Sequence, residues 1–126
     1  MDDVVIIGGG IIGAATAYFL SKEGRKVKVI ERDPTYKSAS FPLSLGGFRR
    51  QFYQKENILL GKFARDFIFQ IPELLKTKKN PNPTASMVPN GYLLMFGPDD
   101  AEEQYRALEN HKECDAGTKN IKGSEL

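Results

Sequence analysis

Three glycines near the start of the chain have the spacing of a phosphate-binding turn. Gly8, Gly10 and Gly13 form the pattern Gly-x-Gly-x-x-Gly, and Glu31 follows near the usual spacing of about 20 residues. Glycines let the backbone approach a pyrophosphate closely, and a carboxylate at that distance can accept hydrogen bonds from ribose hydroxyls. This combination of residues predicts the binding of a dinucleotide.

Each residue of the motif has a separate physical task. Gly8 allows a tight turn, Gly10 leaves room for the pyrophosphate, and Gly13 lets a helix pack closely on a strand. The N–H groups at the start of that helix, where Ile11 and Ile12 lie, have no partner within the helix. They carry a partial positive charge of roughly half an electron, so we expect them to bind phosphate oxygens.

The acid at the end of the motif bears on the choice of cofactor. The Glu31 carboxylate would repel a 2′-phosphate on the ribose, which disfavours a cofactor of the NADP type. Arg32 follows directly and offsets part of this repulsion. We include Arg32 among the expected cofactor-binding residues.

The elements that must hold these residues can be read from the surrounding sequence. Residues 4–7 (VVII) predict a strand, and residues 14–21 predict a helix that ends at Gly24. Residues 27–30 (VKVI) predict a second strand, with Glu31 at its end. A glycine motif alone is weak evidence, but strand, helix, second strand and terminal acid are the context that supports it.

Three other interpretations of this stretch fit less well. Residues 4–20 carry no charge, but a membrane span needs about 20 residues, and glycines crowd the centre of this run. A signal peptide would begin with a cationic segment, whereas two aspartates follow Met1. A nucleoside triphosphatase loop would need a lysine and a hydroxyl where Ala14 and Ala15 stand.

The composition is typical of a soluble globular protein of one ordinary domain. The chain has 126 residues, of which 40% are hydrophobic and 27% charged, and a net charge of +2. That charge is too small to indicate binding to nucleic acid or to an anionic membrane surface. The single cysteine, Cys114, cannot form an internal disulfide, which fits a reducing compartment. Because the first predicted strand lies so near Met1, we expect no targeting peptide and a cytoplasmic location.

The segment that follows the first unit, residues 32–57, predicts an irregular loop. It contains small polar residues, then Gly46, Gly47 and Arg49. Two interpretations stay open. The segment is either a solvated loop with exposed arginines, or a second glycine-rich contact to a phosphate or flavin with an arginine facing an anion.

Residues 58–75 predict an amphipathic helix, which Pro72 should end or kink. We expect its aromatic stripe to lie in the core rather than to bind a cofactor. The apolar positions recur every four residues: Leu59, Phe63, Phe67 and Ile71.

The last third of the chain predicts a linker, a strand and a helix. Residues 92–96 (YLLMF) read as the strand. Asp99 and Glu102 have the spacing of a capping box ahead of a mostly exposed helix over residues 100–113. His111 is expected on the surface of that helix, without a catalytic role. No cluster of metal ligands and no Ser/His/Asp set is visible, and the sequence beyond this helix predicts no clear structure.

The chain also resembles a known family. The opening unit together with ERDPTYKSAS, LSLGGFRRQF, KENI and NGYLLMF is similar to the FAD-dependent oxidoreductases of the D-amino-acid oxidase superfamily. The likeness is greatest to the amine-oxidising branch, which includes sarcosine oxidase and proline dehydrogenase β-type subunits and dimethylglycine dehydrogenases. It covers about residues 3–113, and the segment Gly-Gly-x-Arg-x-Gln-Phe is its most discriminating part.

The resemblance implies FAD as the cofactor, and oxidation of the C–N bond of a small amino acid or N-methyl amine by hydride transfer to the flavin. The resemblance also implies that Ser40 lies beside the phosphates of FAD, and that Gly46, Gly47 and Arg49 approach the flavin ring. An arginine there would stabilise the negative charge that develops on reduced flavin. The motif glycines and Glu31 keep the tasks given above, and no residue is implied as an acid or a base.

The implied fold is α/β: a Rossmann-like βαβ FAD-binding unit, followed by the first strand and helix of a substrate domain. We expect residues 1–76 to form the N-terminal part of the FAD-binding domain, 77–90 a linker, and 91–126 an incomplete substrate domain. Phe41 and Pro42 stand where the family usually has a small residue and a glycine. The alternatives are a non-catalytic fragment or small subunit that needs a partner chain, and an NAD-binding domain.

Overall fold

The computed structural model describes residues 3–125. Its contacts divide the chain into two compact units, Met1–Gly47 and Phe48–Leu126. We call these unit 1 and unit 2. The domain boundaries expected from the resemblance stay predictions.

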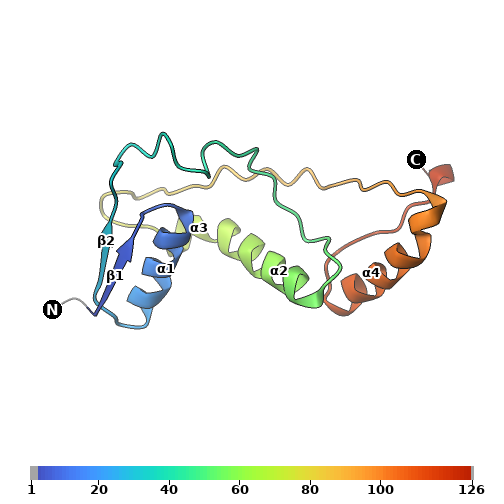
Figure 1. Cartoon of the computed structure of the whole chain (residues 1–126), viewed down its shortest axis with the longest axis horizontal. Helices are drawn as coiled ribbons and strands as arrows, with labels where there is room; N and C mark the ends of the chain where they lie inside the picture. The colour runs from blue at the N-terminus through green and yellow to red at the C-terminus, as the bar shows by residue number, and fades with distance from the viewer. Residues whose placement is uncertain (1–2, 126) are drawn as a thin grey trace. The chain divides into compact units, whose positions relative to one another are not determined.

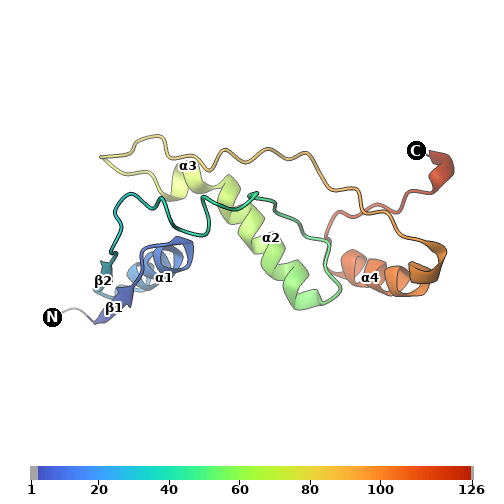
Figure 2. The ribbon, with the colours of Figure 1, turned by 45° about the horizontal axis from the view of Figure 1, so that its top comes forward.

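Unit 1 is built on a strand, a helix and a second strand. β1 spans Val4–Ile7, α1 spans Ile11–Lys22 and β2 spans Val27–Ile30. The two strands are parallel neighbours, in a register that pairs Val4 with Val27. Figures 1 and 2 show α1 lying along one face of the two strands. This is the βαβ arrangement that the sequence predicts.

Glycine sets both ends of α1. Gly10 precedes the first helical residue with an extended backbone (φ −62°, ψ −176°), and its carbonyl accepts a hydrogen bond from the Ala14 N–H at 2.8 Å. Gly24 follows the helix at φ +79° and donates its N–H to the Ser21 carbonyl at 3.0 Å. Because glycine adopts such a φ without strain, Gly24 lets the chain turn towards β2 as predicted.

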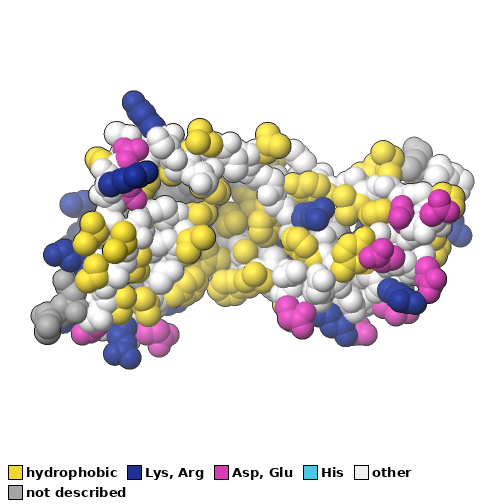
Figure 3. Space-filling view, viewed as in Figure 1, with side chains coloured by type: hydrophobic (Ala, Val, Ile, Leu, Met, Phe, Trp, Pro, Cys, Tyr) yellow, Lys and Arg dark blue, Asp and Glu magenta, His cyan; other side chains and the backbone are white. Residues whose placement is uncertain are grey.

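Much of the apolar surface of unit 1 is open. α1 has no buried residue, and Ile7 and Ile12 are 89% and 81% exposed. In Figure 3 hydrophobic side chains lie uncovered on the visible face of this unit. Parallel strands are usually covered on both faces, so two strands and one helix form only part of such a layered structure.

Unit 2 is helical, with long irregular connections. Residues 75–97 form neither helix nor strand. The helix predicted over residues 58–75 breaks at Gln70, two positions before Pro72. A break there is expected, because proline interrupts a helix. The elements are α2 (Lys55–Phe69), α3 (Ile71–Leu74), the short turn η1 (Pro98–Asp100), α4 (Ala101–Glu113) and the short turn η2 (Gly123–Glu125).

The core of unit 2 is small and joins the start of α2 to the end of α4. Ile58 is fully buried and packs with Cys114, Ala116 and the half-buried Phe52. Lys62 reinforces this contact, because its Nζ donates a hydrogen bond to the Cys114 carbonyl at 2.6 Å. The two helices are therefore held together by one buried isoleucine and a few polar bonds.

His111 is buried, so the expected surface position is wrong. Its side chain is 7% exposed, and its Nε2 lies 2.8 Å from the Phe52 carbonyl oxygen. Ala107 and Cys114 are buried at helical spacing on the same face. The sequence did not predict this narrow buried face, because α4 is mostly polar and the buried positions beside His111 are only the small residues Ala107 and Cys114.

Two further expectations for unit 2 are wrong. Residues 92–96 form no strand, and Met95 is 80% exposed. Within the described part of the chain this segment has no neighbouring strand to satisfy its N–H and C=O groups. The capping box is also absent. α4 begins directly after η1, with Asp100 rather than Asp99 at its N-cap and no side-chain capping bond.

The aromatic stripe of α2 is exposed at two of its four positions. Leu59 and Phe63 are 53% and 56% exposed, although the Phe63 and Phe67 rings stack with centroids 6.4 Å apart. The other two positions of the stripe, Phe67 and Ile71, are half-buried, so the expected core position is wrong only at the two exposed residues. None of the helices between residues 3 and 125 has the length and apolar character that a membrane span requires.

Replacing Ile58 by alanine tests the small core of unit 2. The change removes a fully buried side chain and should lower the free energy of unfolding of this unit by about 2 kcal/mol or more. Amide hydrogen exchange along α4, which contacts α2, measures the loss. Leu60→Ala is the control, because Leu60 is 65% exposed and its loss should cost under about 0.5 kcal/mol. Equal effects of the two changes would contradict this core.

Candidate dinucleotide-binding site

The glycine turn between β1 and α1 is held to the end of β2. The Gly8 N–H donates a hydrogen bond to the Ile30 carbonyl at 2.8 Å, which continues the pairing of the two strands. Gly8 has φ +98°, a value at which a side chain would be strained. The turn therefore carries the chain sharply from β1 into α1, the task expected of Gly8.

Two glycines of the turn meet different demands. A Cβ on Gly13 would lie 2.0 Å from the Gly8 carbonyl oxygen, so a side chain there would push α1 away from the turn. A Cβ on Gly10 would meet no atom within 4 Å. The fold thus requires glycine at position 13, whereas the space at Gly10 is open to a ligand.

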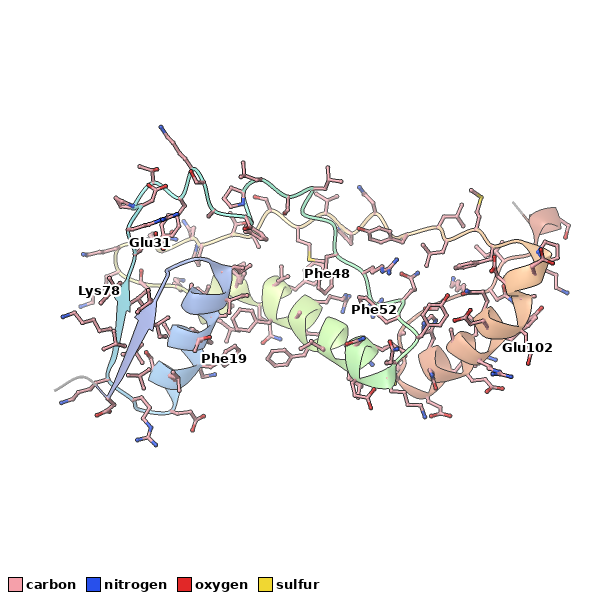
Figure 4. All side chains as sticks on the ribbon, in the orientation of Figure 1. Phe19, Glu31, Phe48, Phe52, Lys78 and Glu102 are labelled. Atoms are coloured by element: carbon pink, nitrogen blue, oxygen red, sulfur yellow. The ribbon has the colours of Figure 1, made fainter. Side chains whose placement is uncertain are left out.

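The Glu31 carboxylate lies against the glycine turn. Its Oε2 accepts a hydrogen bond from the Gly9 N–H at 2.6 Å, and its Oε1 accepts one from the Asp33 N–H at 2.8 Å. The Asp33 and Gly9 N–H groups hold the pKa of Glu31 below its ordinary value of 4.5, so the group is ionised at neutral pH. Figure 4 shows Glu31 just beyond the end of β2. A fixed negative charge therefore lies beside the turn that leads into α1.

The arrangement fits the ADP part of FAD. Gly10 leaves open space beside the start of α1, and the first turn of α1 carries no acidic residue that would repel a pyrophosphate. By the geometry of a helix, the N–H groups of Ile11 and Ile12 have no partner within α1. Each Glu31 oxygen accepts one backbone bond and keeps a second lone pair for a ribose hydroxyl.

Four other expected cofactor residues lie in the irregular part of unit 1. Arg32, Ser40 and Gly47 are exposed. Gly46, at φ +64°, donates its N–H to the Ser44 hydroxyl at 3.2 Å. Their contacts to phosphate or flavin stay predictions.

Arg49 belongs to unit 2. Its guanidinium lies over the Phe52 ring, 5.1 Å from the centroid, and the side chain is exposed. The structure brings together the glycine turn and Glu31. The flavin-side role of Arg49 stays a prediction.

Two backbone groups that sequence reasoning missed complete the site. The Gly9 N–H and the Asp33 N–H are the donors that fix Glu31. The sequence does carry a signal for Gly9. Among residues 8–10 the motif requires glycine only at positions 8 and 10, so a third glycine between them indicates a separate constraint at position 9. The sequence cannot reveal the hydrogen bond from the Asp33 N–H, since every residue other than proline has a backbone N–H. Within residues 3–125, no group of three or more histidine, cysteine, aspartate or glutamate side chains could hold a metal ion.

Gly13→Ala tests the close approach of α1 to the turn. The new Cβ would overlap a backbone oxygen, so unit 1 should lose about 2–3 kcal/mol of stability, measured by urea unfolding. Gly10→Ala is the matched control, because it adds the same methyl group in open space at a φ that alanine adopts. It should cost under about 1 kcal/mol, as for a changed helix cap. Similar losses in both variants would contradict the assigned packing.

The hydrogen bonds to Glu31 predict a titration below the ordinary range. Because the folded-state pKa is lowered, these bonds stabilise the turn above pH 4.5 and are lost as the pH falls through the lower, folded value. The Gly9 amide proton, followed by NMR, should therefore shift with a midpoint below 4.5, and Glu31→Gln should abolish the shift. A midpoint at 4.5 or higher would mean that the turn does not hold the carboxylate.

Comparisons with known proteins bear directly on this site. The sequence pattern of the family described as FAD dependent oxidoreductase matches residues 3–123. The FAD-dependent oxidoreductase domain-containing protein 1 of Xenopus laevis is 42% identical over 122 residues, which cover 90% of this chain and 24% of that protein. The protein of the same name from Bos taurus is 39% identical over 79% of this chain and 21% of its own length.

A shorter likeness involves another protein. Squalene monooxygenase SE2 of Panax ginseng is 62% identical over 34 residues, which are 27% of this chain and 6% of that protein. The chain spans about a quarter or less of the length of each of these curated relatives. No solved structure matches the chain significantly.

The family match covers the glycine turn and Glu31, which the structure joins. It confirms the resemblance and identifies the cofactor as FAD, which removes the NAD-binding alternative. The chain belongs to the family of FAD-dependent oxidoreductases.

Proposed function

We propose that this chain supplies the ADP-binding part of an oxidoreductase that uses FAD to oxidise the C–N bond of a small amine or amino acid. The main support is the 2.6 Å hydrogen bond from the Gly9 N–H to the Glu31 carboxylate. It fixes an ionised acid beside a glycine turn and the start of a helix. An acid and a helix start at this spacing match the ribose and the pyrophosphate of one ligand.

The chain's own residues bind and orient the cofactor. The start of α1, with its N–H groups at Ile11 and Ile12, offsets the charge of the pyrophosphate. Glu31 accepts hydrogen bonds from the ribose hydroxyls, and Gly10 keeps the approach clear. When bound, FAD supplies a flavin ring that accepts a hydride from the substrate.

The substrate class rests on the resemblance of the segment Gly-Gly-x-Arg-x-Gln-Phe to the amine-oxidising branch. Sarcosine, proline and dimethylglycine are the substrates to try first. Arg49 would contribute by stabilising negative charge on the reduced cofactor, and its side chain is exposed. The likeness to squalene monooxygenase carries no argument about substrate, because it covers only 34 residues.

A second proposal is that the chain is non-catalytic by itself and acts with a partner chain or with further segments of a larger protein. The open apolar surface supports it: Ile7 and Leu60 are 89% and 65% exposed, and the described sheet has only two strands. An isolated pair of strands is marginally stable in water. From charge and cysteine content we also propose a cytoplasmic location, with neither nucleic acid nor a membrane surface as partner.

Flavin spectroscopy separates the two proposals. If the chain is a working enzyme, it should take up FAD and turn yellow, and one of the three amines should bleach the flavin band. A yellow chain that none of them reduces would support the non-catalytic proposal. A colourless chain that takes up no added FAD would contradict the proposal that this chain supplies the ADP-binding part of the oxidoreductase.

Glu31→Gln and Gly10→Ala test the cofactor contacts. The first should weaken ADP binding by about 1–3 kcal/mol, because it removes charge-assisted hydrogen bonds to the ribose. The second should weaken it by placing a methyl group in the open space that the pyrophosphate would occupy, while leaving the fold intact. Isothermal titration calorimetry measures both.

Glu109→Gln is the matched control, since it removes the same charge from an exposed position on α4 and should leave ADP affinity unchanged. If neither Glu31→Gln nor Gly10→Ala weakened the binding of ADP, the site would have to lie elsewhere.

A further inference from the structure

The side chain of Tyr36 folds back over the glycine turn of unit 1. A Cβ on Gly9 would lie 2.9 Å from the Tyr36 hydroxyl oxygen, 3.3 Å from the Glu31 Cβ and 3.5 Å from the Glu31 Oε2. The Tyr36 hydroxyl and the Glu31 carboxylate thus converge on the same side of Gly9. Glycine at position 9 leaves the room for both groups.

The backbone that presents Tyr36 is held in an uncommon conformation. Its φ is +56°, in the left-handed region that aromatic residues rarely adopt. The Tyr36 N–H donates to the Asp33 carbonyl at 3.1 Å, and the Thr35 N–H and hydroxyl donate to the Asp33 carboxylate at 2.9 and 2.6 Å. The Asp33 N–H in turn donates to Glu31. One turn therefore fixes the positions of Tyr36 and Glu31 relative to each other.

The Tyr36 hydroxyl supplies the chemistry that the carboxylate lacks. Ionised Glu31 can only accept hydrogen bonds, whereas a phenol O–H can donate one. The Tyr36 side chain is 39% exposed, so its hydroxyl is open to a ligand that approaches the turn. A ribose hydroxyl both donates and accepts, so a donor and an acceptor at one place complement it.

We propose that Tyr36 is a cofactor-binding residue, whose hydroxyl donates a hydrogen bond to an adenosine ribose hydroxyl of FAD beside the Glu31 carboxylate. The proposal rests on the ADP site proposed above and adds a second residue to its ribose end. Tyr36 would therefore favour a nucleotide with an intact ribose. Of the two analogues 2′-deoxy-ADP and 3′-deoxy-ADP, one lacks the hydroxyl that Tyr36 would contact.

The test compares the full chain with Tyr36→Phe in titrations with ADP, 2′-deoxy-ADP and 3′-deoxy-ADP. Tyr36→Phe should weaken ADP binding roughly two- to tenfold, the range for one lost hydrogen bond. It should leave unchanged the affinity for the deoxy analogue that lacks the contacted hydroxyl. Tyr105→Phe is the matched control, because it removes the same oxygen from an exposed tyrosine of α4 and should change no affinity.

The ligand-free NMR shift of the Gly9 amide checks the fold of the variant. It should stay at its wild-type value in Tyr36→Phe, since the Glu31 bond is retained. If Tyr36→Phe weakened all three ligands equally, or none of them, the ribose contact would be overturned while Glu31→Gln still tested the ADP site. Failure of the wild-type chain to bind ADP would overturn both proposals.

Discussion

The hydrogen bond from the Gly9 N–H to the Glu31 carboxylate is the contact on which the site depends. It joins two residues 22 positions apart, one in the turn before α1 and the other after β2. The bond forms only because β1 and β2 pair in parallel, with Ile7 opposite Ile30, so that both strands end at the same edge. Ligands of α/β proteins bind outside this edge of the sheet. The proposed cofactor site is therefore a direct consequence of strand register.

The packing around this contact explains why the turn is so rich in glycine. Gly8 meets a backbone demand, Gly13 a packing demand, and Gly9 leaves room for the side chains of Glu31 and Tyr36. A Cβ on Gly10 would meet no atom within 4 Å, and its φ of −62° suits any residue, so neither packing nor backbone strain explains this glycine, which fits a position kept clear for a ligand. Outside the turn the chain buries little, since Ile58 is its only large side chain that is fully buried among the described residues. The glycine turn that carries the proposed ADP site is thus held by specific contacts, whereas little of the rest of the chain is buried.

The sequence predicted the parts of the structure that local rules decide. The βαβ unit, the helix end at Gly24 and the break before Pro72 follow from glycine, proline and the spacing of apolar residues. The buried position of His111 and the missing strand at residues 92–96 could not be predicted in this way. A strand needs a partner, and a buried histidine needs an acceptor such as the Phe52 carbonyl, and both are supplied by distant segments. The sequence likewise identified Glu31 and the three motif glycines, because residue type and spacing mark them. It missed the Gly9 and Asp33 N–H groups that hold the Glu31 carboxylate, because these bonds form between backbone groups and a side chain only in the folded chain.

An NMR titration of the isotope-labelled chain with ADP tests the central claim most directly. If the glycine turn and Glu31 form one site for the ADP part of FAD, the largest amide shifts should fall on Gly9, Gly10, Ile11 and Ile12, and on Asp33 through the Glu31 carboxylate. The amides of α4 in unit 2 should stay unchanged. Binding of ADP with its largest shifts outside residues 8–13 and 31–33, or the absence of any shift at saturating ADP, would contradict this account.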